Sequence, residues 1–258
     1  MIELNNYSLL TIFVVAFAVI LASCEIGRWL AARVVGKNAG AISTLESAVF
    51  GLLALMIGFT FAMSLSRFEA RRDAVLNEAN SIGTTALRAR LLPEPHRTET
   101  LKLLQEYVKI RLDITRRPVS PKELTAAIDR SSAIQEALWQ QAMAMAAINN
   151  GMVPTGLFIQ TLNEMIDNQE KRLTAVLNQV PNIALLALFA LAAIGMGFAG
   201  YASGLEKGPS RLPNLITVLI ISGVLLLILD LDRPGTGFIK VSQQPMIDTA
   251  ASIATFSH

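Results

Sequence analysis

Four polar side chains follow one face of a long apolar segment and continue into a charged region. Thr60, Ser64, Arg67 and Arg71 are separated by four, three and four residues, which places them on one side of an α-helix. Hydroxyl groups inside a membrane segment, with guanidinium groups at its end, suit the path of an ion, because the arginines would attract anions to the mouth. The spacing therefore suggests a pore face.

Apolar side chains accompany this polar row. Ile57 lies on the same helical face and Phe61 lies beside it, so both could form a constriction. The predicted pore face comprises Ile57, Thr60, Phe61, Ser64, Arg67 and Arg71. A second interpretation stays open, in which the hydroxyls bond to carbonyls of their own helix and the arginines reach lipid headgroups.

Residues for catalysis or metal binding are sparse. The two histidines are His96, beside two prolines, and His258, and the single cysteine is Cys24. His, Cys and carboxylate side chains do not cluster at the spacing of metal ligands, and no nucleophile lies in a recognisable motif. We therefore expect no enzyme activity, no catalytic residues, no metal and no cofactor.

A run of small residues lies in a second apolar segment. Gly195, Gly197 and Gly200 match the letters of a dinucleotide-binding motif, but that motif needs a preceding strand, which an apolar membrane segment does not supply. Gly200 and Gly204 form a GxxxG pair, a pattern that allows two helix backbones to approach closely. We expect these four glycines to form a helix-packing face.

The elements that would position these residues are membrane helices. Four stretches carry no charged side chain: Leu4–Cys24, Ser47–Ser66, Leu173–Leu205 and Leu212–Leu229. Each contains an apolar run near the length that crosses a bilayer, about 20 residues. The first is expected to be an uncleaved helix rather than a signal peptide, because Arg28 and the next basic residues follow the apolar run instead of preceding it.

Between the second and third stretches lies a charged segment with helical patterns. The segment from Arg67 to Arg172 holds 15 of the 22 Lys and Arg residues and 13 of the 20 Asp and Glu residues. The net charge of +2 is too small to favour a nucleic-acid partner. We predict an all-α integral membrane protein with four transmembrane helices and a soluble four-helix bundle inserted between the second and third.

The predicted domains follow from this layout. Transmembrane helices 1 and 2 occupy residues 1–66, and the helical insert occupies residues 67–180. Transmembrane helices 3 and 4 occupy residues 181–231, and a short tail occupies residues 232–258. No breaker separates the second membrane helix from the insert, so one helix should continue to Leu92, before Pro93. A buried stripe is predicted in the insert at Val75, Ala79, Ile82 and Ala86. The next helix carries residues at helical spacing: Leu101, Leu104, Val108, Arg111 and Leu112.

The distribution of positive charge gives a weak orientation. Seven Lys and Arg residues near membrane ends lie on the side of the insert and five lie on the opposite side. The positive-inside rule then favours a cytoplasmic insert in a multi-pass protein of the inner, or plasma, membrane.

Several motifs resemble one family. The stretch Gly58–Arg72, the segment Glu78–Thr84 and the sequence Leu231-Asp232-Arg233-Pro234 together resemble the bestrophin-like domain-of-unknown-function membrane proteins of bacteria and plants. The residues that carry the motif most specifically are Glu78, Asn80, Asp232, Arg233 and Pro234. One departure is Gly235, where the family pattern would place an aromatic residue.

The resemblance implies four membrane helices with a helical insert between the second and third. It also points, by shared layout, to anion channels that are pentamers with a pore lined by the second helix. The first hypothesis is a homo-oligomeric channel in the lipid bilayer that conducts ions, with anions favoured. The alternative is a non-conducting membrane scaffold or sensor whose insert binds a partner.

Overall fold

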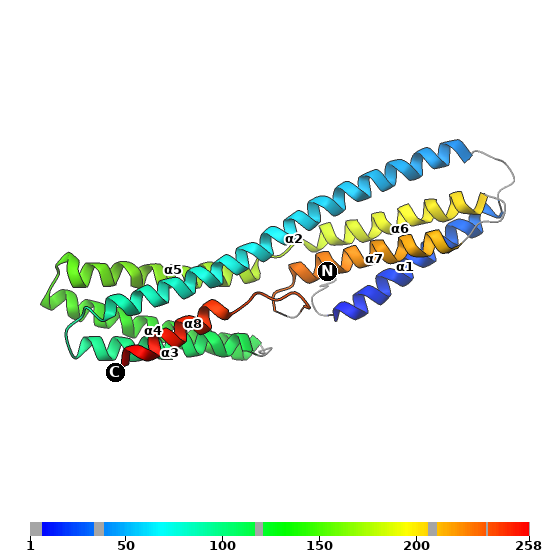
Figure 1. Ribbon diagram of the computed structural model, residues 1–258. Helices are drawn as coiled ribbons and strands as arrows, with labels where there is room; N and C mark the ends of the chain where they lie inside the picture. Colours follow the sequence, from blue (N-terminus) through cyan, green and yellow to red (C-terminus); the bar gives the residue numbers. More distant parts are fainter. Residues whose placement is uncertain (1–6, 34–38, 117–120, 206–210, 236, 258) are drawn as a thin grey trace. The chain divides into compact units, whose positions relative to one another are not determined.

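The structure is a computed structural model that describes residues 7–33, 39–116, 121–205, 211–235 and 237–257 (Figure 1). The described residues form helices and connecting segments without a β-strand, so the predicted all-α class is confirmed. The elements are α1 (Leu9–Ala31), α2 (Ala39–Ala89), α3 (His96–Arg116), α4 (Pro121–Ile148), η2 (Met152–Gly156), α5 (Leu157–Leu177), α6 (Asn182–Leu205), α7 (Leu212–Asp232), α8 (Gln244–Ala254) and η3 (Thr255–Ser257).

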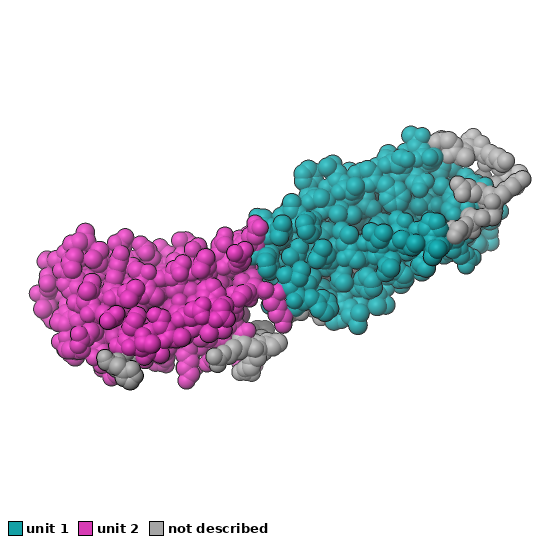
Figure 2. Space-filling view, in the orientation of Figure 1, with its two compact units in different colours: residues 1–68, 179–239 teal, residues 69–178, 240–258 magenta. Residues whose placement is uncertain are grey.

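Two compact units share these helices, and Figure 2 colours them separately. Unit 1 contains residues 1–68 and 179–239, and unit 2 contains residues 69–178 and 240–258. The boundary within α2 falls between Phe68 and Glu69, although the helix itself is continuous across it. The last 19 residues therefore belong with the charged insert, where the sequence suggested only a tail.

Unit 1 contains the apolar helices. Within it, α1 packs along α6 and α7, and the first part of α2 completes the unit (Figure 1). Buried side chains such as Ile20, Leu188 and Leu225 fill the space between the helices. Four helices in the described chain are long and apolar enough to cross a membrane: α1, α2, the segment containing α6, and α7. The chain is a multi-pass membrane protein.

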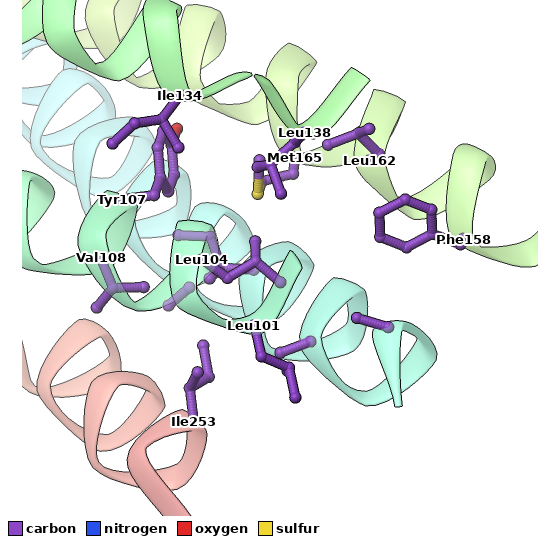
Figure 3. Close-up of a cluster of buried hydrophobic side chains, with 14 of the residues drawn as sticks. Leu101, Leu104, Tyr107, Val108, Ile134, Leu138, Phe158, Leu162, Met165 and Ile253 are labelled. Atoms are coloured by element: carbon purple, nitrogen blue, oxygen red, sulfur yellow. The ribbon is translucent and has the colours of Figure 1, made fainter. Parts of the chain in front are cut away.

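Unit 2 contains the second part of α2 together with α3, α4, α5 and α8. The predicted stripe of Val75, Ala79, Ile82 and Ala86 is buried, as the helical spacing indicated. Leu104, Leu138 and Met165 come from three different helices and meet in the core shown in Figure 3. Burial of these apolar side chains is the main stabilising contribution of the unit.

α2 ends at Ala89, three residues before the predicted end at Leu92, and α8 is the main element that the sequence interpretation missed. It is short, and it follows a segment with Pro234 and Gly235. Met246 and Ile253, seven residues apart, are both buried against unit 2. This spacing of two helical turns was the available signal, but two apolar residues are too few to predict a helix.

Candidate functional site

The first candidate site is the predicted pore face of α2. Thr60 and Ser64 are 5% and 0% exposed, and Arg71 is also buried, whereas Ile57, Phe61 and Arg67 are half-buried. The Thr60 hydroxyl donates to the Met56 carbonyl of its own helix at 2.7 Å. Thr60, Ser64 and Arg71 are therefore enclosed within the single chain, and their place in a pore lining stays a prediction.

The opposite face of α2 in unit 1 is open. Leu52, Leu55, Phe59 and Met63, which we call the outward row, are 40–66% exposed and are spaced by three, four and four residues. Phe59 is the most exposed of the four, at 66%. The row continues one turn further to Ser66, which is also exposed. α2 therefore presents an apolar face outside its own protomer, with a hydroxyl group at the end nearest the insert.

The glycines of α6 lie against α1. A Cβ atom on Gly200 would collide with the Cys24 carbonyl, and one on Gly204 would lie 2.7 Å from the Ala31 Cβ. Gly197 approaches Ser23, whose hydroxyl donates to the Ala193 carbonyl at 2.6 Å. Gly195 instead faces Val49 of α2 at 3.3 Å. Small residues thus permit close approach of α6 to α1.

The second candidate site is a group of buried polar side chains in unit 2. Glu78 of α2 is fully buried and accepts hydrogen bonds from two arginines. Its Oε1 lies 2.7 Å from Nε of Arg111, on α3, and its Oε2 lies 2.5 Å from Nη1 of Arg172, on α5. Arg172 also donates to Gln243, just before α8, at 2.9 Å. One carboxylate therefore connects α2 with α3 and α5, and Arg172 extends the connection to α8.

Neutral polar groups complete this site, which we call the Glu78 cluster (Glu78, Tyr107, Arg111, Gln135, Gln169 and Arg172). The Tyr107 hydroxyl donates to Gln169 Oε1 at 2.6 Å, and the Gln135 amide donates to the same oxygen at 3.0 Å. Burial, with the nearby Glu78 carboxylate, raises the pKa of Tyr107 and keeps its hydroxyl neutral. The sequence placed Arg111 at helical spacing with three leucines and a valine, but its ion pair with Glu78, 33 residues away in sequence, could not be inferred from spacing.

The third candidate site is the turn after α7. Asp232 is buried and its carboxylate accepts a hydrogen bond from the Val180 amide at 2.9 Å, just before α6. Asp230 accepts from the amides of Phe238 and Ile239 at 2.7 and 3.0 Å. Arg233 donates to the Tyr7 carbonyl at 2.7 Å. These charged groups therefore hold backbone segments of unit 1 together.

The other residues singled out from the sequence have local roles. Arg28 and Glu25, three residues apart, approach to 3.9 Å near the end of α1. Asn80 is exposed and borders a groove of about 440 Å³ between α2 and α8. Pro234 is half-buried in the turn after α7. Within the described part of the chain, no three His, Cys, Asp or Glu side chains converge as metal ligands.

The family follows from a comparison over almost the whole chain. The model of the Bestrophin-like domain matches residues 12–246, which include most of α1, the other three membrane helices and the Asp232-Arg233-Pro234 turn. The chain belongs to the Bestrophin-like family. No curated protein sequence matches this Bestrophin-like chain.

Solved structures support the same fold. A bacterial Bestrophin homologue from Klebsiella pneumoniae is 15% identical, with a TM-score of 0.68 over 97% of this chain and 98% of that chain. A variant of that homologue with one tryptophan replaced by alanine is 16% identical, with a TM-score of 0.67 over 96% of each chain. At 15–16% sequence identity, these similarities show that this Bestrophin-like protein shares the fold of the homologue.

Proposed function

We propose that this Bestrophin-like protein is a homo-oligomeric membrane channel that conducts ions along an axis surrounded by α2. The observation that carries the proposal is the outward row, four apolar side chains on the unpacked face of a 51-residue helix. Copies of this face around an axis would form a narrow apolar pore, and such constrictions gate by excluding water.

The proposed lining differs from the predicted pore face by about half a turn of α2. Phe59 takes the central position because it is the most exposed member of the outward row, with Leu55 and Met63 on either side. Ser66 provides a polar group at the inner end. Thr60 and Ser64 support packing within the protomer instead.

Anions are the favoured charge in the proposal. Arg67 is half-buried and Arg72 is exposed near the end of the membrane segment, so their positive charges raise the local anion concentration. The insert is proposed to be cytoplasmic in the inner membrane, following the excess of basic residues on its side.

Ion flux from liposomes tests the channel directly. Purified protein should release a trapped anion faster than empty liposomes do, and replacement of Phe59 by alanine should raise the flux at least severalfold by widening the constriction. Thr60→Val is the matched control, because it changes a buried neighbour of similar size and should leave the flux unchanged.

Absence of flux across several salts and pH values would contradict the channel and favour the scaffold or sensor. Equal flux in the wild type and Phe59→Ala, with altered flux in Thr60→Val, would return the lining to the buried face.

A further inference from the structure

The Glu78 cluster contains more positive than negative charge. A single carboxylate, Glu78, pairs with both Arg111 and Arg172, and these three side chains are at most 7% exposed. The remaining members of the cluster, Tyr107, Gln135 and Gln169, are neutral. A net positive charge away from water costs several kcal/mol unless another charge compensates it.

One guanidinium nitrogen of Arg111 marks the position where a negative charge would offset the excess positive charge of the cluster. Arg111 is 1% exposed, and its Nε and Nη2 donate to Glu78 at 2.7 and 3.4 Å. Its Nη1 is buried and has no hydrogen-bond acceptor. A buried donor without an acceptor loses its hydration without replacement, which is costly for a charged group.

We propose that the Glu78 cluster binds one small inorganic anion, such as chloride, against Nη1 of Arg111. The anion would place a negative charge beside the paired arginines. It would also accept hydrogen bonds from the N–H groups of Arg111 Nη1. This site lies in unit 2, apart from the outward row, and does not depend on conduction.

The chemistry of the surrounding groups fits a monatomic anion. The Tyr107 hydroxyl and the side-chain amides of Gln135 and Gln169 are donors whose direction can change by rotation. Enclosure of the cluster excludes large anions, because a carboxylate such as gluconate cannot enter without separating the helices. The nearest acid is already shared by two arginines, so it cannot neutralise the site alone.

Thermal unfolding of the full-length protein in detergent tests the proposal. The unfolding midpoint should be higher in sodium chloride than in sodium gluconate at equal ionic strength. When chloride exceeds its dissociation constant about a hundredfold, the increase should be roughly 5 °C. Equal midpoints in the two salts would overturn the site.

Gln169→Glu tests the charge argument. The new carboxylate has nearly the same shape, keeps an acceptor for Tyr107 and Gln135, and adds the missing negative charge. The chloride-dependent increase should disappear, and the midpoint in gluconate should rise above that of the wild type. Asn77→Asp adds the same charge at an exposed position of α2 and should retain the full chloride effect.

Diffraction from wild-type crystals grown in sodium bromide tests anion binding at Arg111 without any variant, so it applies even if the variants fail to fold. An anomalous bromide peak within hydrogen-bonding distance of Arg111 Nη1 would support the proposal. A bromide map without that peak, or a chloride effect that persists in Gln169→Glu, would refute it.

Discussion

At the scale of single residues, Glu78 is a fully buried carboxylate that pairs with two arginines. It lies on α2, and its two ion pairs reach side chains 33 and 94 residues later in the sequence. Burial makes these bonds depend on one another, because a carboxylate removed from between two arginines leaves both guanidinium groups uncompensated.

Replacement of Glu78 by glutamine should therefore destabilise the protein by about 3 kcal/mol or more, because it breaks a buried ion pair. Glu69→Gln removes the same charge from an exposed position of the same helix and should have little effect. Thermal unfolding of both variants gives the comparison. A Glu78→Gln variant as stable as Glu69→Gln would show that the arginines find other partners.

At the scale of elements, α2 has two faces with different roles. Its inner face carries the apolar stripe of unit 2 and the buried hydroxyls of unit 1, and its outer face carries the outward row. Helical spacing identified the members of both faces, but only contacts with other helices distinguish the inner from the outer one.

The buried stripe of Val75, Ala79, Ile82 and Ala86 leads to a prediction about the stability of unit 2. Ile82→Asp should destabilise unit 2 by roughly 3 kcal/mol or more, because it places an unpaired charge in the core. Leu87 lies on the same helix but is 52% exposed, so Leu87→Asp should be tolerated. Equal melting temperatures for the two variants would mean that the Ile82 position is hydrated.

The close contact between α1 and α6 leads to a prediction about the stability of unit 1. Gly200→Ala should lower stability by about 1–3 kcal/mol, since overpacking forces the helices apart. Gly223 of α7 has open space around the corresponding position, so Gly223→Ala should be neutral. Loss of folded protein on size-exclusion chromatography after mild heating provides the measurement. Similar behaviour of both variants would contradict a close α1–α6 contact.

At the scale of the whole molecule, a multi-pass protein of the Bestrophin-like family leaves an apolar row of its second membrane helix uncovered in the single chain. In the proposed channel this row surrounds the axis, and Ser66 lies at its inner end. Charge introduced at Ser66 should therefore act on permeating ions.

Ser66→Lys should shift the reversal potential toward that of the anion, and Ser66→Glu should shift it toward that of the cation, in asymmetric salt across a planar bilayer. Lysine and glutamate at Asn77, which is exposed in unit 2, serve as controls of equal charge. Identical reversal potentials for the two Ser66 variants would remove this position from the lining.

The sequence by itself determined the membrane helices and placed the end of α2 near Pro93, because apolar length, helical spacing and proline act locally along the chain. It also determined the family, since Glu78-Ala79-Asn80 and Asp232-Arg233-Pro234 are local motifs. Tertiary structure decided which face of α2 is enclosed, which arginines share Glu78 and where α8 packs. Those features depend on contacts between segments far apart in sequence, and a helical period alone contains no information about the partner that covers each face.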